Sequence, residues 1–225
     1  MRQLLFYNFI NMTQSIIAHI YKDRLTNNVL PIAKNKDNTY ISAKDKKLNR
    51  PYLVIFSNKK VYYLSIKTIN KYNRFATFKD ITNVNIRDKN IYGQSGVLGN
   101  SINCSVINIM DKQMFLDLYD LSSNLNNVKV NDKIYQKVML KVNKNLISNN
   151  VWFSQVIGFE NNQTQFLWEN EIDINIKKEI IDFIKIYKEI WDSNFISLDK
   201  LKVLNLTKEE INELKEHFIK LGYSK

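Results

Sequence analysis

The sequence predicts an α+β fold, with a β-rich part over residues 1–150 and a β-hairpin followed by acidic helices over residues 151–225. Short runs of β-branched and aromatic residues recur between residues 52 and 168, bounded by polar turns. Apolar residues then recur at helical spacing between 176 and 221. The chain has 225 residues, 44% of them hydrophobic and 12% aromatic. It can therefore bury a core without disulfide bonds.

The first predicted elements are a helix and a β-hairpin. Residues 13–25 carry apolar side chains at helical spacing, and two asparagines at 27 and 28 end the pattern. A polar, Lys-rich stretch follows until the composition changes at Arg50 and Pro51. Residues 52–56 and 61–66 are apolar runs joined by a polar turn, which predicts two antiparallel strands.

The middle of the chain predicts short elements around a long loop. Residues 67–100 are mostly polar and contain three of the five glycines, which predicts a loop interrupted by short strands near Phe78 and Val84. Residues 102–110 predict a strand that leads into a short helix at 114–121. The alternation of apolar and polar residues over 129–142 predicts one or two further strands.

The C-terminal part predicts a hairpin and then helices. Residues 151–159 and 164–168 form the hairpin, which turns at two asparagines. A long helix spans 176–191, and Thr207 with Glu210 forms a capping box that begins a last helix, which Gly222 ends. No Pro, Gly or Ser linker separates the parts, so we expect these helices to pack on the β-rich part.

Charge is divided unevenly along the chain. Residues 1–150 contain 23 Lys and Arg against 9 Asp and no Glu, a net charge of +14. Residues 151–225 contain 10 Lys, 4 Asp and 9 Glu, a net charge of −3. This asymmetry favours a polyanionic partner for the first part. Codon bias in an AT-rich genome is the alternative explanation, but it does not account for the absence of Glu before Glu160.

Several classes of protein are disfavoured. The single Cys104 excludes an internal disulfide framework, and His19 and His217 have no Cys or His beside them at metal-ligand spacing. The apolar stretch at 4–10 lacks the features of a signal peptide, and no run of about 18 apolar residues occurs. We therefore expect a cytoplasmic protein with no membrane span, no metal and no cofactor.

Cations and aromatic residues are interleaved after the predicted hairpin. Proteins that bind single-stranded nucleic acid use cations to contact the phosphates and aromatic rings to stack on the bases, so this mixture indicates such a site. A solvated, Lys-rich loop over buried aromatics is the alternative. Metal-independent RNA cleavage needs a hydroxyl that orients the phosphate and cations that stabilise its charge. The candidate catalytic residues are Ser65, Lys67, Thr68 and Lys71, and the candidate nucleic-acid-binding residues are Arg50, Tyr72, Arg74, Lys79, Arg87 and Lys89.

Two other chemistries are less well supported. A metal-dependent nuclease needs clustered carboxylates, whereas the aspartates of the basic part are scattered. Residues 197–222 have the order of a helix-turn-helix unit, but the glutamates on its second helix would be repelled by phosphates. We therefore expect a packing or partner-binding role for this segment.

Short motifs over residues 50–142 carry a family resemblance. The run Arg50-Pro51-Tyr52-Leu53-Val54-Ile55 resembles the R-P-x-x-V-I opening of the barrel in the MazF/PemK-like toxin superfamily. Asn100-Ser101 and the passage from Ser105 to Phe115 resemble its D-S pair, strand and I-D-K motif before a short helix. Type III toxins of the same fold also place a hydroxyl and lysines after the second strand, where this chain has Lys67, Thr68 and Lys71.

The resemblance covers only residues 50–142 and implies a small SH3-like β-barrel there. Together with the residue patterns outside this range, it predicts such a barrel with peripheral helices and a C-terminal helical extension. It also implies a metal-independent endoribonuclease whose partners are RNA and a neutralising antitoxin, itself RNA or protein. The sequence departs from the protein-neutralised branch at Asn100, where Asp is typical, and at Asn108, where Arg is typical. Two alternatives remain: a non-catalytic RNA- or DNA-binding accessory protein of a mobile element, and a protein-interaction module.

Overall fold

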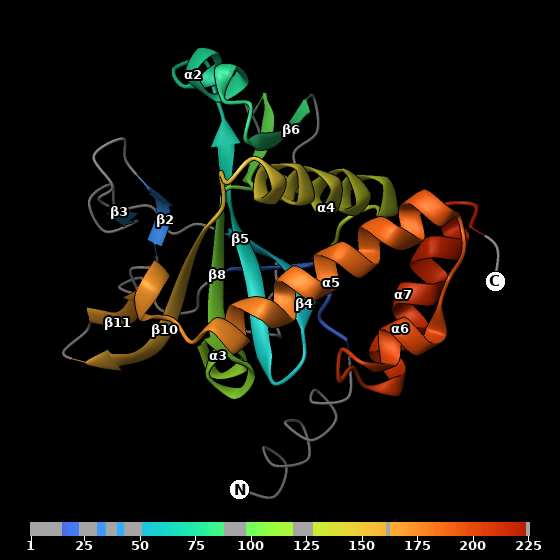
Figure 1. Ribbon diagram of the computed structural model, residues 1–225. Coiled ribbons are helices and arrows are strands. Elements are labelled where there is room, and N and C mark those ends of the chain that lie inside the picture. The colour runs from blue at the N-terminus through green and yellow to red at the C-terminus, as the bar shows by residue number, and fades with distance from the viewer. Residues whose placement is uncertain are drawn as a thin grey trace, which may run out of the picture.

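The computed structural model describes residues 15–22, 31–34, 40–42, 51–87, 98–118, 128–160 and 163–223 (Figure 1). The α+β class is confirmed. The strands are β1 (His19–Lys22), β2 (Pro31–Lys34), β3 (Tyr40–Ser42), β4 (Pro51–Ser57), β5 (Lys60–Ile69), β6 (Asn83–Arg87), β7 (Gly99–Asn103), β8 (Val106–Asp111), β9 (Val128–Lys129), β10 (Trp152–Glu160) and β11 (Gln163–Trp168). The helices are α2 (Arg74–Lys79), α3 (Lys112–Leu118), α4 (Asp132–Ile147), α5 (Ile174–Ser193), α6 (Leu198–Lys202) and α7 (Lys208–Lys220), with a short 3₁₀ turn at Glu169–Glu171.

The strands form an open nine-stranded sheet around β5. The main order is β11-β10-β8-β5-β4-β1-β9, and β2 pairs with β3 in a separate two-stranded sheet. The first half of β5 pairs with β8 and its second half with β7, which also pairs with β6. The predicted hairpin of β4 and β5 is confirmed, and most of β4 and residues 61–66 of β5 are buried on both faces, as their largely apolar runs require. β8 and β10 are parallel, and the other pairs are antiparallel.

The expected SH3-like barrel is not confirmed, because the described sheet does not close on itself. The prediction of strands over 129–142 is wrong except at Lys129, the last residue of β9. Most of this region forms α4, capped by the Asn131 side chain, which accepts a hydrogen bond from the Lys133 backbone N–H. Tyr135, Val138 and Val142 are buried on one side of the helix. Their spacing of three and four residues matches a helix, and it outweighs the local alternation that suggested a strand.

Three other predictions need correction. The expected helix over 13–25 is instead β1 within the described residues, and it begins after Ala18, whose φ of 66° is incompatible with a right-handed helix. The strand expected near Phe78 is α2, whereas the strand near Val84 is confirmed as β6. The single strand expected over 102–110 is two strands, β7 and β8, separated by Cys104 and Ser105. The short helix after them is confirmed as α3.

Buried side chains form a core on each side of the sheet. On one side α4, α5 and α7 contribute to the larger core, where Phe56 of β4 stacks on Phe183 of α5 with ring centroids 4.4 Å apart. On the other side Phe115 of α3 packs edge-on against Tyr21 at 5.3 Å. The expected packing of the C-terminal helices on the strands is therefore confirmed, as are the hairpin of β10 and β11 and the long helix α5.

The last helix begins and ends where its sequence predicts. Thr207 and Glu210 form the reciprocal capping box of α7, and Gly222 follows the helix with a φ of 92°. Glu210 is 1% exposed, and its carboxylate lies 3.1 Å from Lys112 Nζ. The acidic α7 thus pairs with a lysine at the start of α3.

Tyr135 of α4 forms a hydrogen bond to the backbone of β4 in the sheet. Its buried hydroxyl donates a hydrogen bond of 2.7 Å to the carbonyl of Ile55. The register between β4 and β5 shifts between Val54 and Phe56, so Ile55 lies at an irregularity in the pattern of hydrogen bonds between the two strands. The phenol therefore supplies a partner to a buried carbonyl at that point.

Replacing Tyr135 by Phe is expected to lower the free energy of unfolding by about 1–2 kcal/mol, because a buried carbonyl loses its donor while the ring remains packed. Urea unfolding followed by circular dichroism measures the change. Tyr72→Phe is the matched control, since Tyr72 is 84% exposed, and it should leave stability unchanged. Equal stability of Tyr135→Phe and the unchanged protein would contradict the role of this hydrogen bond.

Candidate nucleic-acid interface

A projection that we name the α2 prong, residues 70–82, extends β5 and returns into β6 (Figure 1). Side chains fix both of its ends. Asn70 accepts hydrogen bonds from the backbone of Tyr72 and Asn73, and Asn73 donates to the carbonyl of Thr68 at 2.8 Å. At the other end the Asp80 carboxylate accepts from the backbone and side chain of Thr82. The prong is thus held in shape by its own polar residues.

The prong presents rings and cations to solvent. Tyr72 is 84% exposed and Phe75 is 66% exposed. Lys71 Nζ lies 5.0 Å from the centre of the Tyr72 ring, and the Arg74 guanidinium lies 4.6 Å from the centre of the Phe75 ring. Lys79, in the last turn of α2, is also exposed. Each ring with its adjacent cation could stack on a base while the cation contacts the phosphate.

Four lysines follow one another along the surface of α4, and we name them the α4 lysine row: Lys133, Lys137, Lys141 and Lys144. Their spacing of four, four and three residues keeps them on one side of a helix. Lys141 Nζ donates to the carbonyl of Ile81 at 3.1 Å, and the Asn145 amide donates to the carbonyl of Thr82 at 2.9 Å. These bonds join the row to the base of the α2 prong.

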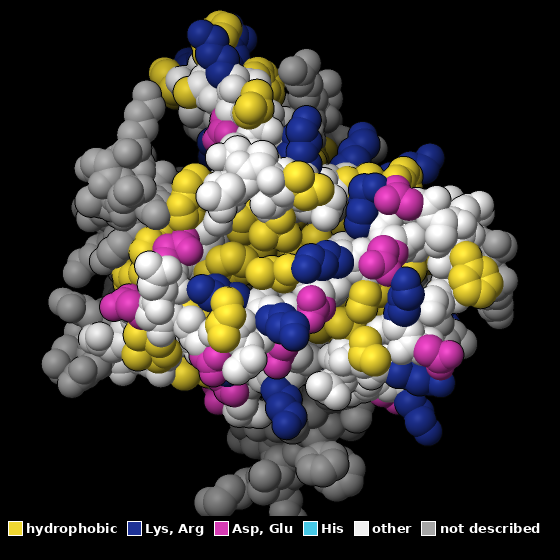
Figure 2. All heavy atoms as spheres, viewed as in Figure 1, with side chains coloured by type: hydrophobic (Ala, Val, Ile, Leu, Met, Phe, Trp, Pro, Cys, Tyr) yellow, Lys and Arg dark blue, Asp and Glu magenta, His cyan; other side chains and the backbone are white. Residues whose placement is uncertain are grey.

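The prong and the row together form one basic surface. Figure 2 shows Lys and Arg side chains over α2 and α4 in its upper part with few Asp or Glu side chains among them, whereas the lower part mixes the two more evenly. Asp80 is the only acidic residue in 51–87 and Asp132 the only one in 128–150. Both carboxylates have other partners, Thr82 and His217. No ion pair joins the seven cations of the prong and the row to a carboxylate in the described part of the chain.

The residues predicted to be catalytic do not gather at this surface. Ser65 is 3% exposed and lies opposite Tyr52 within the sheet. Lys67 and Thr68 are half-buried at the end of β5, where they pair with Ser101 and Asn100 of β7. Only Lys71 is fully exposed. The hydroxyl of Ser65 therefore does not lie beside the exposed cations of the prong.

The residues predicted to bind nucleic acid are partly brought together. Tyr72, Arg74 and Lys79 all belong to the α2 prong. Arg87 is the last residue of β6, and its side chain lies outside the described residues, as do Arg50 and Lys89 altogether. The predicted group therefore corresponds, where it is described, to one end of the basic surface.

Sequence reasoning missed the α4 lysine row. The region was expected to form strands, in which side chains alternate between two faces, so that Lys144 would lie opposite the other three lysines. The spacing of four, four and three residues was the available signal, because it places all four on one side only in a helix.

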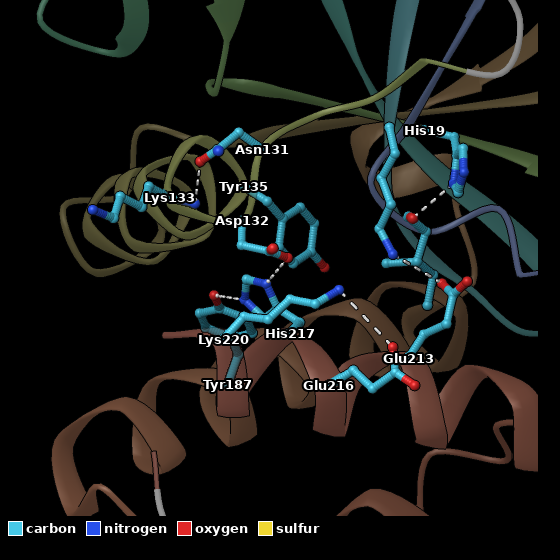
Figure 3. A network of polar contacts seen from close by, with 12 residues as sticks. His19, Asn131, Asp132, Lys133, Tyr135, Tyr187, Glu213, Glu216, His217 and Lys220 are labelled. Atoms are coloured by element: carbon cyan, nitrogen blue, oxygen red, sulfur yellow. Dashed lines mark hydrogen bonds and ion pairs between the residues drawn. The ribbon is translucent and has the colours of Figure 1, made fainter. Parts of the chain in front are cut away.

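A second polar cluster lies in the core between three helices (Figure 3). The Tyr187 hydroxyl is 2.6 Å from His217 Nε2, and His217 Nδ1 is 2.9 Å from the Asp132 carboxylate. Burial lowers the pKa of His217, and the hydrogen bond that its Nδ1–H donates to the Asp132 carboxylate opposes this shift. A neutral imidazole fits both bonds, because Tyr187 donates to Nε2 while Nδ1–H donates to Asp132.

Tyr187, His217 and Asp132 are connected in the order of a catalytic nucleophile, base and carboxylate. Their burial in the core nevertheless favours a structural role. Tyr187 is 2% exposed, and burial raises the pKa of its phenol. The adjoining cavity, lined by Asp132, Tyr135 and His217 among others, has a volume of only about 10 Å³. No substrate fits there, so the three side chains serve to join α4, α5 and α7.

Within the described ranges, no group of three His, Cys, Asp or Glu side chains could hold a metal ion, and no helix is long and apolar enough to cross a membrane. Comparison with known proteins finds no match: no family model, no curated protein and no solved structure is significantly similar to this chain. The MazF/PemK-like resemblance therefore stays a prediction from short motifs.

Proposed function

We propose that this protein binds single-stranded RNA along the basic surface made by the α2 prong and the α4 lysine row. The observation that carries the proposal is that seven cations, none with a carboxylate partner among the described residues, belong to two segments that meet where Lys141 contacts Ile81. Neutralising phosphates at such a surface releases counterions from the nucleic acid, and this release drives binding.

The exposed rings of the prong favour an unpaired strand over a duplex. Tyr72 and Phe75 are large apolar side chains that project into solvent beside Lys71 and Arg74. Unpaired bases can stack on such rings, whereas the bases of an A-form duplex are already stacked on each other. The prong is also too short a helix to read a groove in the manner of a recognition helix.

Binding is better supported than cleavage. An endoribonuclease of the kind that the resemblance implies would need a hydroxyl and cations at the same phosphate. Ser65 is buried and Thr68 is half-buried in the β5–β7 ladder, whereas Lys71 and Arg74 lie on the exposed prong. We therefore propose the non-catalytic alternative, in which the protein binds RNA without cleaving it.

The test is a fluorescence anisotropy titration of the full chain with a labelled 12-nucleotide uridine oligomer at several salt concentrations. The seven cations predict a slope of log affinity against log salt of about −5, at about 0.7 per phosphate contact for a single strand. A duplex of the same length should bind more weakly. Absence of binding at 50 mM salt would overturn the proposal and favour a protein-interaction module. Cleaved oligomer carrying a 2′,3′-cyclic phosphate would instead restore the endoribonuclease.

Replacing Tyr72 by Ala is expected to lower affinity for the uridine oligomer about tenfold, because a stacked base contributes about 1–3 kcal/mol. Tyr72→Phe is the matched control and should keep most of the affinity, since it retains the ring. Tyr72→Ala should leave the salt slope unchanged, because no cation is removed. An affinity equal to that of the unchanged protein would show that no base stacks on this ring.

A further inference from the structure

A pocket of about 550 Å³ lies just beyond the C-terminal end of α4, at the start of β10 and the end of β11. Two tryptophans, two glutamates and two asparagines line it: Trp152, Trp168, Glu169, Glu171, Asn149 and Asn170. Asn149 lies five residues after Lys144, the last cation of the α4 lysine row, and its φ of 54° falls just after the helix ends. The pocket therefore lies beside the C-terminal end of the helix that carries the row.

The two indoles stand on the same face of the sheet. Trp168 of β11 pairs directly with Ser154 of β10, and Trp152 precedes Ser154 by two residues. Side chains two residues apart in a strand share a face, so Trp152 and Trp168 are diagonal neighbours across the two strands. Both are only half-buried and both reach the pocket. Such a pair offers aromatic surface on which a planar ligand could stack.

The carboxylates are held in place by backbone groups. Glu169 accepts a hydrogen bond from the Phe153 N–H at 3.0 Å, and Glu171 accepts one from the Trp168 N–H at 2.8 Å. Each carboxylate has about four acceptor positions, so one bond leaves others available. Glu171 is exposed and forms no ion pair with a described lysine or arginine. It therefore presents an acceptor to a ligand that carries N–H donors.

We propose that this pocket binds an unpaired guanine base of the RNA that lies on the basic surface, an inference that rests on the proposed function. Guanine alone among the four bases presents two adjacent donors, N1–H and the N2 amine, on its Watson–Crick edge. A carboxylate accepts both, while adenine and cytosine place a ring acceptor beside their single amine, and uracil places carbonyls on both sides of its N–H. The indoles then stack on the purine.

The test compares uridine decamers that carry one central guanosine, inosine or adenosine with the all-uridine decamer. We expect the guanosine oligomer to bind at least fivefold more tightly than the adenosine oligomer, with inosine in between because it lacks the N2 amine. Stacking of the base should quench tryptophan fluorescence when GMP is titrated into the protein. The Trp191→Phe variant is used because it removes the third tryptophan, which packs against Tyr223, so that the signal comes from Trp152 and Trp168 alone.

Glu171→Gln is the decisive variant. It keeps an oxygen that can accept from the Trp168 N–H but replaces the other acceptor by a donor, so the preference for guanosine should disappear while affinity for the all-uridine decamer stays unchanged. Glu209→Gln is the matched control, because it removes the same charge from an exposed residue in the first turn of α7. This variant should keep the preference for the guanosine oligomer.

The outcomes separate the inference from the proposed function. Equal affinity for all the decamers, with a steep salt dependence, would overturn the guanine pocket and leave RNA binding intact. Quenching by GMP without any binding of the decamers would support the pocket and overturn the basic surface as an RNA site. Quenching by argininamide but not by GMP would show a cation site instead, and would overturn the guanine assignment.

Discussion

Replacing all four lysines of the α4 lysine row by glutamine is expected to weaken binding of the uridine oligomer several hundredfold at 100 mM salt. For a single strand, the slope of log affinity against log salt is about −0.7 for each phosphate contact. Between 1 M and 100 mM salt, each contact therefore adds about 0.7 to the logarithm of affinity, and four contacts add about 2.8. The four side chains lie on the surface of α4, away from its buried residues. The fold should therefore persist, and circular dichroism together with the unfolding midpoint would verify it.

The salt dependence gives a second, independent result. Loss of the row should reduce the slope of log affinity against log salt from about −5 to about −2, since the three cations of the α2 prong remain. The matched control replaces four exposed lysines of α6 and α7 by glutamine: Lys200, Lys202, Lys208 and Lys220. This control has the same net charge, so its affinity should stay within a few fold of the original. Equal losses in both variants would show that net charge alone attracts the RNA.

Replacing His217 by Ala is expected to lower the free energy of unfolding by about 3 kcal/mol at pH 7.5. The change removes both hydrogen bonds of the imidazole, leaves the buried Tyr187 hydroxyl without an acceptor, and opens a cavity between α4, α5 and α7 (Figure 3). His217→Gln should recover part of the loss, because an amide can accept from Tyr187 and donate to Asp132. Urea unfolding of both variants measures the difference.

Stability should also fall as the pH is lowered below about 6.5. Burial lowers the pKa of both His217 and His19 in the folded protein, so the unfolded chain binds more protons than the folded one in this range. The contribution of these histidines is fully present above pH 6.5 and is lost as the pH falls towards their folded pKa values. His217→Gln should therefore lose less stability between pH 7 and pH 5.5 than the unchanged protein does. An identical pH dependence would show that His217 does not titrate in this window.

The errors of the sequence-based predictions have a common physical origin. The apolar residues over 13–25 fit a helix by spacing, but Ile20 and Tyr21 lie in the cores on opposite sides of the sheet, which a strand achieves through its alternation. The region of α4 alternates locally, yet its face of Tyr135, Val138 and Val142 covers the sheet only as a helix. Short segments satisfy both periodicities, and the packing surface available to them selects one.

Only part of the basic surface could be predicted from the sequence. Interleaving of cations and aromatics was sufficient to single out Lys71, Tyr72, Arg74 and Lys79, because they are close in sequence and belong to one short projection. The lysines of α4 could not be joined to them from the sequence, since between 54 and 73 residues separate them along the chain. Contacts such as the bond from Lys141 to Ile81 create that proximity.

By itself, the sequence determined the α+β class, the two hairpins, the long helix α5, the capped helix α7 and the strongly basic character of the first 150 residues. These properties depend on local spacing and on composition, which neighbouring residues specify directly. Only the tertiary structure decided that the sheet stays open, that Ser65 is buried and that cations from two distant segments share one surface. Those outcomes depend on which faces of the sheet the helices cover, and burial of apolar area over the whole chain, not local pattern, selects among the alternatives.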